Sequence, residues 1–330
     1  MINIMVTGVG ALLGQGIIKA LKYSSLKYNL VGTDYFAKSV GLYWVDKGYI
    51  LPDILDKRVN NMNEWLPMII DIIKINSIDI VLVGLDFEVP LFAKYKNKIE
   101  DSTRAKVVVS SPEVVDTCKD KWRTVNFLKE NGYNYPESCL PDDLDYFLNN
   151  NNFPLIAKPR FGSTSKDLFK VNNIKELQIA IKKCDKPIIQ KLIGNDNNEF
   201  TCSSTFYKKE ILTCISLRRE LKNGNTFLAF SEKHTEIDKF ITKITKSLKP
   251  NGPTNFQLRI TDKGPTVFEI NPRFSGTTPI RAIFGINEVE AVVNAILYGK
   301  TQIKMTKKEG VVIRYLDNQF ITWEQYNEFK

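Results

Sequence analysis

Apolar runs and amphipathic stretches alternate along the first third of the chain. The runs within Ile2 to Val6, Asp79 to Val83 and Lys106 to Ser110 are short and rich in β-branched residues, as in strands that are buried on both faces. Between them, Ile17 to Lys22 and Ile69 to Asn76 have the apolar spacing of helices. Strands and helices that alternate in this order predict a mostly parallel sheet, so this part is expected to be an α/β domain.

Strict alternation of apolar and polar residues appears later, on both sides of a turn. Asn255 to Ile260 and Thr266 to Ile270 flank Asp262-Lys263-Gly264, and the glycine can adopt the left-handed conformation that a three-residue hairpin loop needs. The sequence therefore predicts an antiparallel hairpin. Its core face is expected to hold Phe256, Leu258, Ile260, Phe268 and Ile270.

The opposite face of this hairpin carries polar side chains. If the turn is centred on Lys263, Gln257 lies opposite Glu269, and Asn255 lies opposite Asn271, because antiparallel partners are equidistant from the turn. Oxygen-bearing side chains grouped in this way suit magnesium, which proteins hold through one or two carboxylates and substrate phosphates. The alternative is a polar face turned to water, and alternation alone favours it.

The sequence directly after Glu269 shifts the balance toward a binding site. A proline at 272 ends ladder pairing and stiffens the exit from the strand, so Arg273 leaves in a fixed direction near the carboxylate. Its planar guanidinium suits phosphate oxygens. The run Phe268-Glu269-Ile270-Asn271-Pro272-Arg273, with Gln257 upstream, resembles the metal-binding signature of the ATP-grasp superfamily and is most similar to its carbamoyl-phosphate-synthetase-like branch.

This resemblance implies a fold and cofactors. Residues 1–117 would form a Rossmann-like preATP-grasp domain, residues 118–190 the N-terminal ATP-grasp subdomain with a phosphate-covering loop, and residues 191–330 the C-terminal subdomain with the metal site. The expected fold class is thus α/β and α+β. ATP and Mg²⁺ (or Mn²⁺) are the implied cofactors, and the implied site consists of the metal ligands Gln257, Glu269 and Asn271, with Arg273 neutralising charge on the transferred phosphoryl group.

Two lysines precede the hairpin at places that suit phosphate binding. Lys121 follows the predicted cap Asp120 in a first helical turn, where the helix dipole disfavours a cation unless an anion is near, although a surface lysine is the simpler interpretation. Lys158 ends a strand, and a loop rich in small hydroxyl residues follows, which can fold backbone N–H groups over phosphates. The resemblance implies that both lysines contact phosphates, that Lys158 is also catalytic, and that the covering loop acts through Ser163, Thr164 and Ser165.

The segment Pro187 to Gly194 reads as a strand that runs into a linker, and it is the expected adenine site. Adenine needs an apolar slot and an edge-on backbone donor and acceptor, which a hinge strand supplies. The resemblance places this hinge at Gln190, Lys191, Leu192 and Ile193. It also implies that Glu199 holds the ribose hydroxyls, and an exposed strand-end acid is an equally good interpretation of that residue.

Several residues are candidates for contact with the acid substrate. Arg218 and Arg219 could grip a carboxylate or an acyl phosphate, although paired arginines are more often a solvated face. If the resemblance holds, three more residues lie beside the acyl-phosphate position: Ser275, Gly276 and Arg281.

Two features of the first domain leave alternatives open. The glycine-rich turn at 8–16, with Asp34 at the end of the next strand, resembles a dinucleotide-binding fingerprint, but its spacing departs from G-x-G-x-x-G, and such glycines also serve packing. Asp86 and Glu88 follow a predicted strand at the carboxyl edge of the sheet, where α/β sheets bind ligands. Capping of the next helix explains these acids equally well.

Composition narrows the classes of ligand and metal site that the protein is expected to have. The net charge of +9 comes from lysines that are spread along the chain and mixed with acids, which favours small anionic substrates over nucleic acid. Five cysteines without a C-x-x-C pair, and a single histidine, argue against disulfides, zinc sites and multi-histidine sites. The most apolar stretch, Leu66 to Val83, contains charges, and the start lacks the features of a signal peptide, so we expect a cytoplasmic protein that does not bind membranes.

The resemblance to the ATP-grasp superfamily, together with these features, implies an ADP-forming ligase that joins a carboxylate to an amine (or a thiol) through an acyl phosphate. Its partners would be a small-molecule carboxylate and amine, whose identities the sequence does not reveal, and a homodimer stays open. One alternative is a nucleotide-binding regulatory protein without catalysis, which the complete group around Glu269 argues against. Another is an NAD-dependent oxidoreductase built on the turn at 8–16, which leaves that group unexplained.

Overall fold

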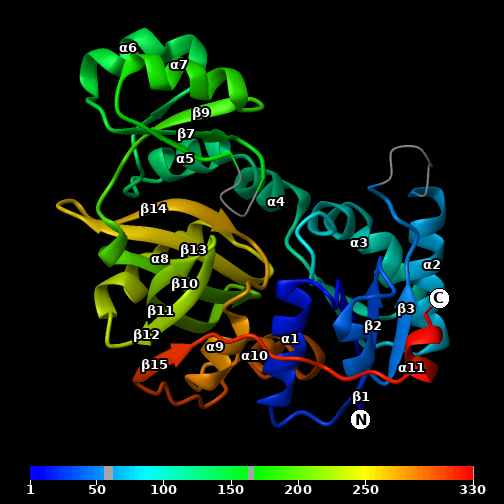
Figure 1. Cartoon of the computed structure of the whole chain (residues 1–330). Coiled ribbons are helices and arrows are strands. Elements are labelled where there is room, and N and C mark those ends of the chain that lie inside the picture. Colours follow the sequence, from blue (N-terminus) through cyan, green and yellow to red (C-terminus); the bar gives the residue numbers. More distant parts are fainter. Residues whose placement is uncertain (56–61, 163–166, 330) are drawn as a thin grey trace.

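The computed structural model describes residues 1–55, 62–162 and 167–329, in which three β-sheets occupy successive stretches of the chain (Figure 1). The first sheet is parallel, and the other two are antiparallel. The expected combination of α/β and α+β architecture is therefore confirmed. None of the described helices is long and apolar enough to cross a membrane.

The first sheet has the strand order β3-β2-β1-β4-β5, and all its pairs are parallel, as predicted. Its strands are β1 (Ile2–Thr7), β2 (Tyr28–Asp34), β3 (Lys47–Ile50), β4 (Ile80–Leu82) and β5 (Lys106–Val108). Its helical segments are α1 (Leu12–Lys22), η1 (Val40–Trp44), α2 (Met62–Ile75), α3 (Val89–Thr103) and α4 (Pro112–Lys119). Apolar side chains fill both faces of the sheet, which explains the continuous apolar runs.

The glycine-rich turn after β1 serves close packing. A Cβ on Gly14 would lie 2.1 Å from the carbonyl oxygen of Gly8, and one on Gly84 would lie 2.7 Å from the Cα of Gly14. The carboxylate of Asp34 accepts hydrogen bonds from the backbone N–H of Gly10 (2.7 Å) and the hydroxyl of Ser39 (2.7 Å). Asp34 is thus bound to the turn itself, which favours the packing interpretation over a dinucleotide site.

The second sheet is small and antiparallel, with the order β6-β9-β7-β8. Its strands are β6 (Ser138–Cys139), β7 (Leu155–Pro159), β8 (Phe169–Val171) and β9 (Pro187–Lys191). The helical segments in this stretch are α5 (Lys121–Glu130), η2 (Pro141–Asp143), α6 (Leu144–Asn150) and α7 (Ile174–Lys183). In Figure 1, α6 and α7 lie together above β9 and β7, and side chains of these helices share one core with the sheet.

The third sheet has the order β14-β13-β10-β11-β12-β15. Its strands are β10 (Glu199–Tyr207), β11 (Glu210–Lys222), β12 (Asn225–Ser231), β13 (Gly252–Thr261), β14 (Gly264–Asn271) and β15 (Gly310–Ile313). The helical segments are η3 (Asp196–Asn198), α8 (Thr235–Leu248), α9 (Thr278–Ile283), α10 (Glu288–Tyr298) and α11 (Trp323–Asn327). Helix α8 packs on one face, and the α9–α10 segment covers one end of the other face. The uncovered remainder of that face is free to line a site.

Strands β13 and β14 form the predicted hairpin with the predicted pairs. Gln257 lies opposite Glu269, and Asn255 lies opposite Asn271. Phe256 and Ile270 are buried beneath α8, so the polar members of these pairs share the other face of the sheet.

The prediction of a three-residue loop is wrong, because a β-bulge changes the register near the turn. Leu258 pairs with Val267 instead of Phe268, and the loop shortens to two residues before Gly264, whose φ is +91°. Val267 is consequently fully buried in the core. The expectation that Phe268 belongs to the core is also wrong, since the bulge turns its ring toward the cavity described below.

The C-terminal part of the chain returns to the first sheet. Phe274, Val289 and Val292 pack in one core with Ile17 and Ile18 of α1. In Figure 1, the last segment crosses from β15 to α11, which lies beside the first sheet. The boundaries at 117/118 and 190/191 stay a prediction.

Candidate functional site

Two cavities meet at the end of the hairpin. The first, of about 280 Å³, lies between the second sheet and the polar face of the third sheet. The second, of about 360 Å³, lies between the hairpin exit and helices α3 and α4 of the first domain. Lys121, Gly162 and Glu269 line both cavities. A ligand in one cavity can therefore reach a ligand in the other at these three residues.

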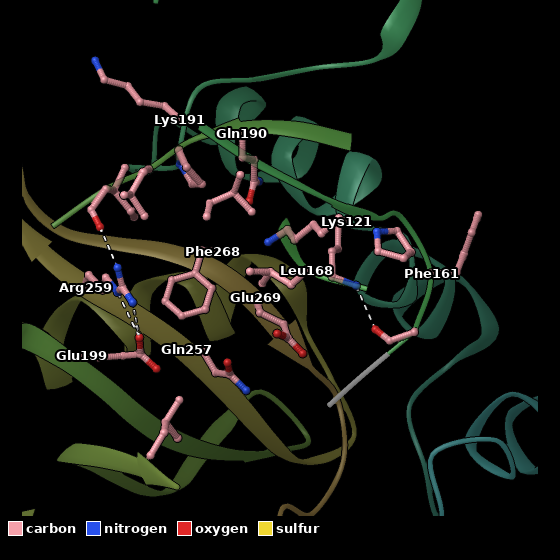
Figure 2. Close-up of a pocket in the computed structure, with 18 of the residues that line it drawn as sticks. Lys121, Phe161, Leu168, Gln190, Lys191, Glu199, Gln257, Arg259, Phe268 and Glu269 are labelled. Carbon is pink, nitrogen blue, oxygen red and sulfur yellow. Dashed lines mark hydrogen bonds and ion pairs between the residues drawn. The ribbon is translucent and has the colours of Figure 1, made fainter. Parts of the chain in front are cut away.

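The polar face of the hairpin points into this junction. Gln257 and Glu269 both line the first cavity (Figure 2). Asn271 lines the second cavity. The Asn271 side-chain amide donates to Glu269 Oε1 over 2.9 Å. Gln257 Oε1 accepts a hydrogen bond from Arg219 Nη2 over 3.0 Å. The three residues predicted to bind a metal are thus brought together around one carboxylate.

Both predicted phosphate lysines lie at this place. Lys158 is only 6% exposed, and its ammonium is 5.8 Å from the centroid of the Phe268 ring. Burial lowers the pKa of Lys158 to about 8, although the Glu269 carboxylate acts in the opposite direction. Lys121 donates to the carbonyl oxygen of Gly162 over 2.8 Å, and burial lowers its pKa too. Two partly desolvated cations therefore lie beside Glu269, where an anion would relieve the cost of burying them.

The start of α5 fixes the position of Lys121. Asp120 caps the helix as predicted, because its carboxylate accepts the N–H of Trp122 over 2.9 Å. The same carboxylate accepts a hydrogen bond from Nε of Arg160 over 3.0 Å, and the backbone N–H of Lys121 donates to the Arg160 carbonyl. These bonds tie α5 to the end of β7, so Lys121 and Lys158 are held on neighbouring elements.

The predicted hinge forms the apolar end of the first cavity. Leu192 and Ile193 line it together with Gln190, which is 2% exposed. Within the described part of the chain, Gln190 Nε2 is buried without a hydrogen-bond partner. Figure 2 shows that the side chain of Lys191 extends away from the cavity. Lys191 therefore lines the cavity only through atoms near its backbone.

Glu199 lies in the first cavity, but its carboxylate is already engaged. Arg219 donates to Oε1 through Nε (3.0 Å) and Nη2 (2.7 Å), and Arg259 donates to Oε2 through Nε (2.9 Å) and Nη2 (2.8 Å). Both oxygens are therefore paired with guanidinium groups. This arrangement makes Glu199 an anchor for two arginines and weakens the expectation that it accepts ribose hydroxyls.

The two adjacent arginines of β11 have different environments. Arg219 lies in the first cavity between Glu199 and Gln257. Arg218 stacks on the Phe230 ring at 3.7 Å and pairs with Glu220, outside both cavities. The grouping of Arg218 with the site stays a prediction that this position does not support, because neighbouring residues of a strand point to opposite faces. Sequence analysis also missed Arg259, although it shares the alternation of Asn255 and Gln257.

The hairpin exit connects to the first domain. Arg273 Nε donates to Asp86 Oδ1 over 2.5 Å, and Nη1 donates to the carbonyl of Phe274 over 3.0 Å. Both charged residues line the second cavity. Asp86 thus lies at the site, whereas Glu88 is fully buried and accepts hydrogen bonds from Thr7 and Tyr35.

Three predicted substrate residues do not line either cavity. Ser275 is buried and bonded to the hydroxyl of Thr277, and the carbonyl of Gly276 accepts from Arg314. Arg281 is 1% exposed, pairs with Glu288 at 3.1 Å and donates to Asn255. Their expected contact with the substrate stays a prediction that these positions outside both cavities do not support. The predicted covering residues Ser163, Thr164 and Ser165 lie outside the described residues.

The donor set fits a magnesium–nucleotide complex. Among residues 1–55, 62–162 and 167–329, no group of three or more His, Cys, Asp and Glu side chains could hold a metal alone. One carboxylate, Glu269, with the amide oxygens of Asn271 and Gln257 nearby, is the sparse ligation that Mg²⁺ accepts when substrate phosphates supply the remaining oxygens. The Asn271 amide uses its nitrogen toward Glu269, which leaves its oxygen to act as a ligand.

Comparisons with known proteins agree with this geometry. Residues 118–277 match the family model of the ATP-grasp domain. The carbamoyl phosphate synthase large chain of Caldanaerobacter subterraneus is 25% identical over 340 residues, which cover 94% of this chain and 30% of that protein. That of a Thermoanaerobacter species is 26% identical over 226 residues, which cover 62% of this chain and 21% of that protein. The chain thus spans less than a third of the length of these relatives.

Solved structures show the same fold. N5-carboxyaminoimidazole synthetase from Staphylococcus aureus, complexed with ADP, superposes with a TM-score of 0.71 at 16% identity, covering 96% of this chain and 82% of that one. L-amino acid ligase from Bacillus licheniformis gives 0.66 at 18% identity, covering 90% and 74%. Residues 118–277 belong to the ATP-grasp family, and the chain is similar to carbamoyl phosphate synthases, as the residues around Glu269 indicated.

Proposed function

We propose that this protein is an ATP-dependent ligase that joins a carboxylate to an amine and releases ADP and phosphate. The observation that carries this proposal is the junction of two cavities at Lys121, Gly162 and Glu269. A reaction between ATP and an acid needs one site for each reactant and one point where the γ-phosphoryl group meets the carboxylate.

The first cavity suits the nucleotide. Its hinge end is apolar and backbone-lined at Leu192 and Ile193, which fits a flat base, and its other end holds Lys121 and Lys158, which fit phosphates. Arg219 and Arg259 also line this cavity, and Arg259 donates to the carbonyl of Ile193 at the hinge end. The structure of the S. aureus synthetase contains ADP, and the same type of ligand is proposed for this chain.

The metal would be held by Glu269 and Asn271, with Gln257 completing the ligands after a change in its bond to Arg219. When bound, Mg²⁺ would offset the negative charge that develops during phosphoryl transfer. Lys158 and Arg273 add fixed positive charge at the transferring group, because the protein contributes mainly position and electrostatics to this reaction.

The chemistry then proceeds in two displacements. A carboxylate oxygen attacks the γ-phosphorus, the bond to the β-phosphate oxygen breaks, and ADP leaves. The amine nitrogen next attacks the carbonyl carbon of the acyl phosphate, inorganic phosphate leaves, and the amine releases one proton. The names of the relatives, carbamoyl phosphate synthase and L-amino acid ligase, support a ligase, and a homodimer stays a prediction.

Replacement of Glu269 tests this function. We expect Glu269→Gln to reduce ADP release with the correct acid and amine at least ~1000-fold, because one charge at the metal position is lost. Glu220→Gln is the matched control, since that side chain is 51% exposed outside both cavities. Undiminished turnover by a folded Glu269→Gln protein would refute the role. ADP release by the wild-type protein with any acid would exclude a purely regulatory protein.

A further inference from the structure

We propose that the second cavity selects an organic carboxylate with an apolar body, of the size of an amino acid or larger, rather than bicarbonate or another small hydrated acid. This inference rests on the proposed ligase function, because it specifies the acid that the ligase activates.

The first domain supplies apolar walls to this cavity. Phe87 precedes α3, Val89 and Pro90 begin it, and Val115 and Cys118 come from α4. The thiol of Cys118 stays protonated, since burial raises its pKa far above the usual range, so these five side chains are uncharged. A small hydrated anion would lose its water against these walls without new hydrogen bonds. An apolar body would instead gain about 25 cal/mol for each Å² removed from water.

The size of the cavity points in the same direction. Its volume of about 360 Å³ falls in the range of roughly 300–1,000 Å³ that pockets for organic ligands occupy. A cavity needs a volume of only about 10–15 Å³ to hold a single water molecule. An acid of four heavy atoms would therefore leave most of the cavity to solvent.

Most of the charged lining residues lie near the junction with the first cavity. Lys121 and Glu269 line that junction, and Arg273 is bonded to Asp86 beside the hairpin exit. The apolar lining residues come from the first domain, which also contributes Lys119. An amphiphilic acid consequently has one favourable orientation, with its carboxylate at the charged end and its body against the apolar end. This orientation brings the carboxylate to the junction where the γ-phosphate of a nucleotide in the first cavity would end.

Phe87 allows a direct test of this assignment. Its side chain is half-buried, lines the cavity and packs on the Tyr35 ring at 5.2 Å between centroids. Removal of the ring should weaken binding of the apolar body equally in the ground state and the transition state. The expected result is a rise in KM for the acid without a comparable change in kcat.

The first experiment measures ADP release with a panel of acids at a fixed excess of amine. We expect leucine, phenylalanine and their analogues without the amino group to give kcat/KM values at least ~100-fold above those of bicarbonate and acetate, which corresponds to burying one large apolar side chain. Equal or better turnover with bicarbonate would overturn the inference while leaving the ligase function in place.

The second experiment compares variants with the best acid. Phe87→Ala should raise its KM about tenfold or more while the KM for ATP stays within twofold, and Phe87→Leu should recover most of the loss. Tyr146→Ala is the control, because Tyr146 is 76% exposed on α6. A KM for the acid that is unchanged in Phe87→Ala would contradict the assignment.

A binding measurement separates failure of this inference from failure of the proposed function. If no acid in the panel causes ADP release, the ligase proposal fails. Calorimetric titration of phenylpropanoate into the wild-type and Phe87→Ala proteins then decides the inference independently. Binding to the wild-type protein that is at least ~tenfold weaker in the variant supports the apolar acid site, and lack of binding to the wild-type protein overturns it.

Discussion

The Nε of Arg273 donates a hydrogen bond to the carboxylate of Asp86 over 2.5 Å, although the two residues are 187 positions apart. This bond links the exit of the hairpin to the start of α3 at the wall of the second cavity. It holds the guanidinium by its edge and so restricts the directions in which Arg273 can meet a phosphoryl group. The orientation of Arg273 therefore depends on the first domain as well as on its own strand.

From this contact we predict that Asp86→Asn lowers kcat for ADP release about tenfold and changes the free energy of unfolding by less than ~1 kcal/mol, because the Asp86 side chain is 41% exposed. Steady-state kinetics and denaturant unfolding measure the two effects. Asp116→Asn is the control, since the Asp116 side chain is 60% exposed and its ion pair with Arg123 is long, at 3.9 Å. Similar activity losses in both variants would contradict a positioning role for Asp86.

Arg218 and Arg219 form a natural matched pair on β11. Arg219→Ala should weaken ATP binding at least tenfold, because Arg219 supports both Gln257 and Glu199 in the first cavity. It should also destabilise the fold by up to about 3 kcal/mol, since the buried Glu199 would keep only Arg259. Arg218→Ala should change ATP affinity less than twofold. Isothermal titration with ATP checks the contrast, and equal effects would show that Arg219 has no special role.

The pKa of Lys158 predicts proton uptake on ATP binding. Burial lowers that pKa to about 8, so in the free protein the ammonium loses its proton as the pH rises through 8. Phosphates favour the charged form, so binding above pH 8 should take up a proton, and affinity should fall by up to about tenfold per pH unit. Calorimetry in buffers of different ionisation enthalpy measures this uptake. Lys158→Arg should abolish it, because arginine remains charged, and an unchanged uptake in that variant would exclude Lys158 as its source.

Glu88 should make stability depend on pH. Burial raises its pKa from 4.5 to about 7, while hydrogen bonds from Thr7 and Tyr35 oppose the shift. A raised folded-state pKa gives stability that is fully present below pH 4.5 and is lost as the pH rises through 7, by about 3 kcal/mol in total. Urea unfolding between pH 4.5 and 8 checks this slope. Glu88→Gln should remove it, the exposed control Glu130→Gln should keep it, and a slope that survives in Glu88→Gln would assign it to other groups.

The parts of the site that could be predicted from the sequence are those that depend on local periodicity. The pairs Gln257 with Glu269 and Asn255 with Asn271 were predicted from distance to a three-residue turn, and they hold because the bulge adds the residue that the shorter loop removes. The cap at Asp120 follows from the first turn of a helix. The β-bulge was not predictable in this way, because it moves one residue out of register without changing the pattern of apolar residues on either side. Phe268 therefore lines the cavity instead of the core.

The sequence by itself determined the parallel first sheet, the hairpin pairing and the presence of Lys121 and Lys158 before it, since strand runs, turn residues and their order are properties of the chain. Only the tertiary structure decided that Arg219 and Arg259 hold Glu199, that Asp86 meets Arg273, and that Arg281 is buried against Glu288. These contacts join residues that are far apart in sequence, and side-chain packing selects them after the sheets have assembled.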